Sequence, residues 1–257
     1  MLKKTALILI IASLFACKER TTHTTFSLIA QSDQETYKKV DHQLRDIKKA
    51  IIAPDIDGSK NDPIWNNTQW YAIDQKWSGA AYSFSDFFAR YKMSWTSEAL
   101  YLLVEIKDDT LINKHTYTPE GNDYIQLFID QDNSGGKFPE QHNIFNYTIT
   151  PDGNVIGFDP KGALLFYNHH VQSQKNSFND VTTWEFKITI YDQSYKENGV
   201  NDQVILQKDQ KLGFMIAYND VDTSSDTSKI GSVFIYEEEY QSLKNNANTF
   251  GTLVLKE

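Results

Sequence analysis

Apolar and polar residues alternate along most of the chain after Pro54, at the period of two that is typical of β-strands. The clearest run spans Leu100 to Lys107, where every second residue is apolar. The stretch Arg90–Trp95 precedes this run and is separated from it by Thr96-Ser97-Glu98. Two alternating runs joined by a short polar turn predict a β-hairpin.

The same alternation recurs in shorter runs that also predict strands, namely Ile125–Ile129, Phe145–Ile149, Trp184–Ile190, Phe214–Tyr218, Val233–Tyr236 and Phe250–Leu255. The sequence Pro151-Asp152-Gly153-Asn154 predicts a turn into a short strand, Val155–Phe158, because proline fixes φ and glycine accepts a positive φ. Many short strands without intervening helices indicate an all-β protein, an antiparallel β-sandwich of the jelly-roll type.

A different period precedes Pro54. Apolar residues recur at helical spacing between Tyr37 and Ile51, and Ser32 with Glu35 three residues later matches a capping box. This pattern predicts a short helix near Asp33 to Lys48 that spaces the sandwich from the N-terminus. The alternative interpretation is an amphipathic helix that binds a partner.

The first residues have the pattern of a secretory signal. Lys3 and Lys4 precede an apolar run from Ala6 to Phe15, which is shorter than the ~20 residues of a membrane-spanning helix. Leu14-Phe15-Ala16-Cys17 resembles a lipobox, where cleavage before the cysteine leads to lipidation of Cys17. An ordinary signal peptide with an incidental cysteine is the alternative.

These patterns predict three segments. Residues 1–16 are expected to be a lipoprotein signal peptide, residues 17–52 a lipidated tether with a helix, and residues 53–257 one β-sandwich domain. Lys18, rather than an aspartate, follows the cysteine, which resembles lipoproteins sent to an outer membrane. Both the periplasmic face and the cell surface remain open.

Composition limits the partners. Cys17 is the only cysteine among 257 residues, so the predicted domain has no disulfide. Removal of residues 1–16, which contain two lysines and no acid, changes the formal net charge from −9 to −11. Such an acidic chain repels nucleic acid and suits neutral ligands, cations or basic partners.

Six short phrases follow one another in a fixed order: Ile56-Asp57-Gly58 with Trp65, Trp95 before Leu100-Tyr101-Leu102, Asp123 before Phe128-Ile129-Asp130, Trp184-Glu185, Gly213-Phe214 before Tyr218-Asn219-Asp220, and Phe250-Gly251. In this order and spacing they resemble a family 9 carbohydrate-binding module, over Pro54 to Glu257. The resemblance implies a β-sandwich that binds sugars. In some members two tryptophans clamp a chain end, and structural calcium lies nearby.

At the clamp positions the chain departs from the family pattern. Glu120 stands where one clamp tryptophan is found, and the second tryptophan falls near Ile235, beside Tyr236. The family's glutamate corresponds to Gln126 and its arginine to Asn146. Both amides still offer a donor and an acceptor to vicinal hydroxyl groups.

The resemblance therefore implies a shifted sugar platform, for which the predicted residues are Tyr117, Asn122, Asp123, Gln126, Asn146 and Tyr236. The two tyrosines are predicted to stack on sugar C–H groups. For each of them, an ordinary aromatic residue at a strand edge is the alternative. Trp65, Trp95 and Trp184 are predicted to lie in the core.

Trp70 and Trp77 flank an irregular stretch. With Tyr71 and Tyr82 they form either an exposed binding surface or, as we prefer, a cluster packed under a loop.

Two acidic segments are candidate calcium sites. Asp130 and Asp132 are spaced like the first ligands of a calcium loop, but the twelfth position is Gln141, so an EF-hand is excluded. Asp220 and Asp222, with Asp226, form the second candidate. No cofactor is required by this interpretation, and simply solvated acidic turns are the alternative for both.

Nothing in the sequence indicates catalysis. The neighbouring carboxylates Asp108 and Asp109, or Glu237 to Glu239, do not naturally face each other across a cleft at ~5 to 9.5 Å, as glycoside hydrolysis requires. His115, His169 and His170 lack a zinc-ligand pattern, and Met93 and Met215, the only candidates for heme ligation after the signal, are explained by strand packing.

The predicted function is non-catalytic carbohydrate binding by a membrane-anchored lipoprotein of the outer membrane. It captures oligosaccharide or polysaccharide for partner glycoside hydrolases or outer-membrane uptake proteins. The alternative is a surface or periplasmic protein-interaction module that has lost the sugar clamp.

Overall fold

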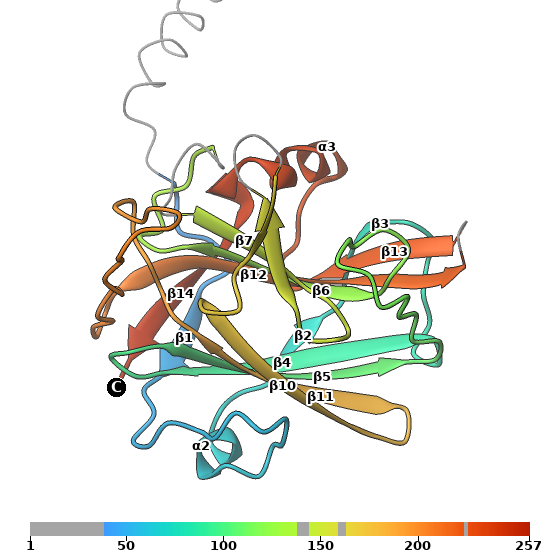
Figure 1. Cartoon of the computed structure of the whole chain (residues 1–257), viewed down its shortest axis with the longest axis horizontal. Coiled ribbons are helices and arrows are strands. Elements are labelled where there is room, and N and C mark those ends of the chain that lie inside the picture. The colour runs from blue at the N-terminus through green and yellow to red at the C-terminus, as the bar shows by residue number, and fades with distance from the viewer. Residues whose placement is uncertain (1–38, 138–143, 159–162, 224–225) are drawn as a thin grey trace, which may run out of the picture. The chain divides into compact units, whose positions relative to one another are not determined.

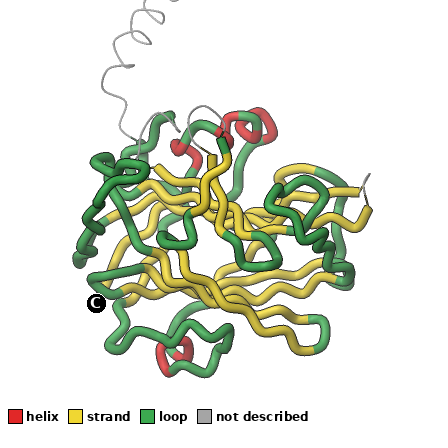
Figure 2. The backbone as a smooth tube through the Cα atoms, in the orientation of Figure 1, coloured by secondary structure: helices red, strands yellow, loops and turns green. Residues whose placement is uncertain are grey.

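The computed structural model describes residues 39–137, 144–158, 163–223 and 226–257. The predicted signal peptide, Cys17 and the first part of the predicted tether lie outside these residues. The described strands form two sheets that pack face to face, with loops and a few short helices around them (Figures 1 and 2). The predicted all-β sandwich is therefore confirmed.

Nine strands make the larger sheet, in the order β1-β14-β12-β6-β7-β8-β9 with β13 beside β12 and β3 beside β13. Their bounds are β1 Arg45–Lys48, β3 Gln75–Ser78, β6 Tyr124–Asp130, β7 Ile144–Ile149, β8 Val155–Phe158, β9 Leu164–Phe166, β12 Lys211–Thr223, β13 Asp226–Gly231 and β14 Gly251–Lys256. The five-stranded sheet has the order β10-β11-β5-β4-β2, with β2 Tyr71–Ile73, β4 Phe87–Trp95, β5 Leu100–Asp108, β10 Val171–Phe178 and β11 Val181–Ile188.

Short helices lie outside the two sheets. In Figure 1, α2 (Pro63–Asn66) lies beyond the five-stranded sheet and α3 (Glu237–Tyr240) beyond the nine-stranded sheet. Two 3₁₀ turns, Ser242–Lys244 and Ala247–Thr249, follow α3. Within the described ranges, no helix is both long enough and apolar enough to cross a membrane.

The predicted hairpin and turn are confirmed. β4 and β5 pair in antiparallel register from Phe87 opposite Asp108 to Trp95 opposite Leu100. Between β7 and β8, Gly153 has φ +81° and its N–H donates to the Thr150 carbonyl at 2.8 Å. Only a glycine takes this backbone conformation without steric cost.

The predicted helix is wrong over Lys39–Lys48, where no residue is helical and Arg45–Lys48 forms a strand. β1 runs parallel to β14, with Ile47 opposite Leu255. Val40 and Leu44 are exposed, whereas Ile47 is buried in the core, so the apolar positions do not share one helical face. The compact unit begins at Lys39, and residues 39–52, predicted as tether, thus belong to the sandwich.

Val233–Tyr236 is the second departure, because this segment is not a strand. Val233 is buried on the outer face of the larger sheet, and its carbonyl accepts a hydrogen bond from the Trp77 indole at 2.9 Å. Tyr236 is the N-cap residue of α3, and its N–H donates to Glu239 Oε2 at 2.9 Å. Capping of α3 replaces strand pairing at this point.

The main core fills the space between the sheets. Its largest fully buried side chains include Phe87, Tyr91, Trp95, Phe186 and Phe214. Burying a side chain of this size contributes roughly 1.5 to 3 kcal/mol. Trp184 lies in the same core, as predicted.

Trp65 is also buried, but outside the five-stranded sheet, where it packs on Tyr101 and Leu103. Glu185 of β11 accepts hydrogen bonds from the Trp65 indole at 2.8 Å and from the backbone N–H groups of Asp57, Gly58 and Ser59 at 3.0, 2.9 and 3.2 Å. One carboxylate thus joins two of the six phrases, which lie far apart in the sequence.

Trp77 is buried as well, so packing rather than an exposed surface is confirmed for it. A Cβ atom at Gly231 would lie 2.0 Å from the Trp77 ring, so only glycine fits at this position. Trp70 is half-buried beneath Arg90, whose guanidinium carbon lies 4.1 Å from the ring centroid.

Candidate functional site

Polar side chains cross the outer face of the nine-stranded sheet from β7 to β13. Gln126 on β6 lies opposite Thr148 on β7, and its amide donates to Thr148 Oγ1 at 3.4 Å. Lys229 on β13 donates to the other end of the same amide, Gln126 Oε1. The amide group of Gln126 is therefore held in one orientation from both sides.

Asn146 lies diagonally next to Gln126. On β7 it is opposite Phe128 of β6 and two residues from Thr148, so its backbone lies about 7 to 8 Å from that of Gln126. Its Oδ1 accepts no hydrogen bond from the described residues. The structure thus brings the two predicted amide residues together on one face.

Aromatic side chains flank this polar strip. Tyr117 is exposed and packs edge-to-face against Phe166 of β9, with ring centroids 5.4 Å apart. On the other side, Lys229 lies over the ring of Tyr124, 5.2 Å from its centroid. Burial, with smaller effects from Tyr240 and Glu120, raises the pKa of Tyr124 to about 12, so it keeps its hydroxyl proton. We call Tyr117, Phe166, Asn146, Gln126, Thr148 and Lys229 the amide face.

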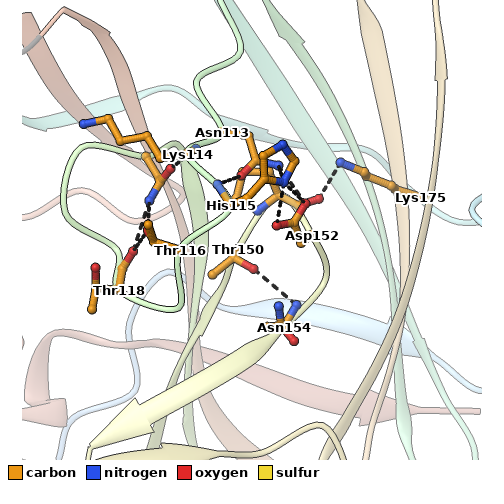
Figure 3. A network of polar contacts seen from close by, with 11 residues as sticks. Asn113, Lys114, His115, Thr116, Thr118, Thr150, Asp152, Asn154 and Lys175 are labelled. Carbon is orange, nitrogen blue, oxygen red and sulfur yellow. Dashed lines mark hydrogen bonds and ion pairs between the residues drawn. The ribbon is translucent and has the colours of Figure 1, made fainter.

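The loop that carries Tyr117 is anchored to the β7–β8 turn. Figure 3 shows Asn113 and His115 pointing toward the carboxylate of Asp152. Asn113 Nδ2 donates to Asp152 Oδ1 at 2.7 Å, and His115 Nδ1 lies 3.1 Å from both carboxylate oxygens. The Asn113 hydrogen bond, with His115 and Lys175 nearby, holds the pKa of Asp152 below its usual value.

Asn122 and Asp123 hold the same loop from inside. Asn122 accepts from the Lys114 N–H at 2.6 Å and donates to Thr116 Oγ1 at 2.9 Å. Asp123 accepts from the N–H groups of Ile112 and Val221. Both side chains are buried, so they position the loop and have no surface to offer a sugar.

Tyr236 is exposed, as a stacking residue must be, but it belongs to a different local cluster. Its ring packs edge-to-face on Phe234, with centroids 5.1 Å apart. Gln43 fixes this segment, because its side chain bonds both the N–H and the carbonyl of Phe234 at 3.0 Å. The ring contact and hydrogen bonds of Tyr236 are therefore with Phe234 and α3, and among the described residues none joins it to the amide face.

Asp220 and Asp222, predicted as one cluster, fall into two groups of three carboxylates. Asp220 groups with Asp108 and Asp123, and Asp222 with Asp86 and Asp109; within each group one oxygen per residue lies within 4.8 Å of the others. No sequence pattern indicated that Asp108 belongs with Asp220, because a long stretch of intervening chain separates them.

Asp220 is the unusual member of its group. It is 5% exposed and accepts no side-chain hydrogen bond from the described residues. Burial, followed by repulsion from Asp108 and other carboxylates, raises the pKa of Asp220 to about 8. Burial likewise raises the pKa of Asp123 to about 7. A divalent cation would offset this repulsion, so the donor set fits calcium.

A small cavity of about 170 Å³ lies beside this carboxylate group, between the ends of the two sheets. Trp184 and Ile149 form part of its apolar wall, and Tyr218 donates to Asp108 at its edge at 2.6 Å.

The other metal candidate does not fit. Asp130 is buried, and the ammonium of Lys39 lies in the loop that follows it, where Lys39 Nζ donates to Asn133 Oδ1 at 2.7 Å. Because the Lys39 ammonium already supplies a positive charge beside Asp130, no metal ion is needed to balance this carboxylate. Neither Asp130 nor Asp132 occurs in a cluster of three metal-ligating groups among the described residues.

Two residues of the amide face carry no signal in the sequence. Phe166 lies in a short apolar run without alternation, and Lys229 lies in β13, which no pattern predicted. Only the pairing of β13 with β12 brings Lys229 to Gln126.

Comparison with known proteins identifies the family. A family model described as carbohydrate family 9 binding domain-like matches residues 56–257. Endo-1,4-beta-xylanase C of Paenibacillus barcinonensis is 25% identical over 209 residues, which make up 78% of this chain and 18% of the xylanase. The chain thus spans less than a fifth of the length of that relative.

Two solved structures of a family 9 carbohydrate-binding module from Caldicellulosiruptor kristjanssonii share the fold. The complex with cellotriose has a TM-score of 0.59 at 20% identity, over 83% of this chain and 94% of that one. The complex with glucose has a TM-score of 0.58 at 20% identity, over 82% and 96%. Because the family model covers nearly the whole described sandwich, the chain belongs to the carbohydrate family 9 binding domain-like family.

Proposed function

We propose that this chain binds carbohydrate without cleaving it, on the amide face of the nine-stranded sheet. The observation that carries the proposal is the Gln126 amide, held by Thr148 and Lys229 beside Asn146. A fixed amide can donate to one sugar hydroxyl and accept from the next. The exposed Tyr117–Phe166 pair supplies an apolar surface at the rim for sugar C–H groups.

A neutral gluco-oligosaccharide is the ligand class that we favour. The related bacterial modules are described in complex with cellotriose and glucose. The formal net charge of −9 disfavours acidic glycans. Non-catalytic capture also agrees with the family, described as binding domain-like, and with a match to only 18% of a much longer xylanase.

Substitution of the amide residues tests this proposal. Gln126→Ala is expected to weaken cellotriose binding by about tenfold or more, since it removes a donor and an acceptor at about 1 to 1.5 kcal/mol. Asn146→Ala is expected to weaken it less, because Asn146 Oδ1 is buried and only its N–H groups can reach a ligand. Gln172→Ala, on the exposed surface of the other sheet, is the matched control. Isothermal calorimetry with the purified full chain in detergent measures the affinities.

Two outcomes contradict the proposal. One is unchanged affinity in both amide variants. The other is the absence of binding to any glycan on an array by a folded wild-type protein, which would favour the protein-interaction module.

We also propose that Cys17 carries the lipid anchor of an outer-membrane lipoprotein, which presents captured glycan to glycoside hydrolases or uptake proteins. The lipobox-like Leu14–Cys17 segment supports this anchor. Fatty-acid labelling of cells that express the chain tests it, and equal labelling of a Cys17→Ser variant would contradict it.

Calcium is proposed to bind the Asp108–Asp123–Asp220 group. At a calcium concentration of 100 times Kd, binding adds about 2.7 kcal/mol, which raises the unfolding midpoint of a domain of this size by about 5 to 10 °C. Asp220→Asn is expected to abolish this rise, whereas Asp132→Asn is expected to keep it. Differential scanning calorimetry with calcium or with chelator measures the midpoints, and an equal rise in all three proteins would refute the assignment.

A further inference from the structure

A lysine side chain occupies the loop that follows β6. Lys39 is 3% exposed, and its Nζ donates to Asn133 Oδ1 at 2.7 Å. Thr252 of β14 donates to the same oxygen at 3.3 Å. The ammonium therefore contacts the middle residue of the Asp130–Gly136 loop, although Lys39 precedes Asn133 by 94 residues.

Asp130 provides the negative charge that matches this ammonium. Its side chain is fully buried; Oδ2 accepts the Gly135 N–H at 2.7 Å, and Oδ1 accepts no hydrogen bond from the described residues. Burial raises the pKa of Asp130 to about 7, and Lys39 acts against this rise. Burial lowers the pKa of Lys39 to about 8, and Asp130 acts against that fall. Each charge thus favours the ionised form of the other.

The space under the loop is shaped around these two side chains. A Cβ atom at Gly213 on β12 would lie 3.1 Å from Lys39 Nζ and 2.9 Å from the Asp130 Cβ. Asp41, two residues after Lys39, accepts a hydrogen bond from Asn133 Nδ2 at 2.9 Å. The segment that carries the ammonium is therefore tied to the loop at a second point.

We propose that the Lys39 ammonium is the resident cation of the Asp130–Gly136 loop, in the position that a calcium ion would take there. The oxygen atoms of the loop thus stabilise the charge of a lysine side chain and not that of a metal ion. As a consequence, the loop reaches its closed form only when the chain just before β1 docks on it. Closure of the loop and attachment of β1 then form one cooperative unit.

Removal of each charge, singly and together, tests this proposal on the full chain in detergent. Lys39→Met keeps the length of the side chain but leaves Asp130 buried without a cation, so the unfolding midpoint is expected to fall by about 10 °C. Asp130→Asn keeps an acceptor for Gly135. In the double variant, the amide at position 130 carries no charge that needs compensation, so at least half of the loss is expected to be recovered.

Lys211→Met is the matched control, because its ammonium contacts Asp41 at the surface. Its midpoint is expected to change by less than about 3 °C. Additive losses in the double variant, or a stable Lys39→Met protein, would overturn the proposal.

A calcium titration provides an independent readout. In an Asp220→Asn background, where the other carboxylate group is disabled, calcium is expected to leave the unfolding midpoint unchanged. A calcium-dependent rise in that background, lost again on adding Asp130→Asn, would show that the loop holds a metal and would overturn the assignment to Lys39.

Discussion

Glu185→Ala is expected to lower the free energy of unfolding by about 3 to 5 kcal/mol, because four hydrogen-bond donors lose the acceptor that they share. Glu185 is fully buried on β11 and accepts four hydrogen bonds, three from the backbone of residues 57–59 and one from the Trp65 indole. Alanine leaves these donors without an acceptor, and each buried unpaired donor costs about 1 to 3 kcal/mol.

In the Glu185→Ala variant, the segment around α2 should unfold locally before the whole domain unfolds. The four bonds attach the segment that contains α2 to the outer face of the five-stranded sheet, where Trp65 packs on Tyr101 and Leu103. Hydrogen exchange should therefore accelerate first in residues 55–66. At Gly58, φ is +81° and a Cβ atom would lie 2.6 Å from the Lys175 backbone, so the same turn depends on glycine.

Urea denaturation followed by circular dichroism measures the change. Glu98→Ala, at the exposed turn between β4 and β5, is the control and should stay within about 0.5 kcal/mol of the wild type. Equal stability of the Glu98 and Glu185 variants would contradict the assigned role of Glu185.

Acidification from pH 7 to pH 4 is expected to remove about 3 kcal/mol of stability through His170 alone. Burial, with a smaller contribution from His169, lowers the pKa of His170 to about 3, against 6.5 in an unfolded chain. Between these values the unfolded chain binds a proton that the folded chain excludes. Stability therefore falls as the pH drops from about 6.5 towards 3, and this contribution is fully present only above 6.5.

The surroundings explain why this histidine stays neutral. The His170 ring is fully buried, its Nδ1 lies 2.8 Å from the Tyr147 hydroxyl, and its Nε2 has no partner among the described residues. Aromatic rings enclose it, namely Phe145, Tyr147, Tyr167, His169, Tyr191 and Tyr195. Glu197, a carboxylate beside this cluster, accepts a hydrogen bond from the Tyr167 hydroxyl at 2.5 Å.

Comparison with His170→Gln isolates the effect, because glutamine can still bond Tyr147 but does not titrate. Asp123, Asp130 and Asp220, whose raised pKa values favour the folded state at low pH, act in the opposite direction but are common to both proteins. The measured quantity is the difference in unfolding free energy between the two proteins from pH 4 to pH 7. A difference that stays constant over this range would contradict the buried neutral state.

The strands were largely predictable from the sequence because alternation reports which side of a strand faces a core. The prediction of secondary structure failed where an apolar pattern is compatible with more than one element. The residues around Ile47 match both a helix and a strand, and only their pairing with β14, at the far end of the chain, decides between them. Val233–Tyr236 alternates as well, but Val233 meets Trp77 and Tyr236 caps α3 instead.

The grouping of residues at the candidate site was predictable in part. Gln126 and Asn146 were predicted because they occupy family positions on adjacent strands, and strand register alone brings them together. Asn122 and Asp123 were also at such positions, yet the loop needs their polar atoms for its own backbone. Lys229, Phe166 and Lys39 act through contacts between distant segments, for which a single sequence contains no local signal.

The parallel pairing of β1 with β14 also determines how the domain responds to mechanical load. Any pull on the chain before Lys39 reaches the sandwich first at Lys39 and then at β1. The component of the pull along β1 loads the Arg45–Lys48 ladder in shear, so its hydrogen bonds must break together and not one after another. The Lys39 ammonium, buried just ahead of the ladder, would bear the load first. The edge of the sandwich at β1 therefore resists shear through the whole ladder and not through one hydrogen bond at a time.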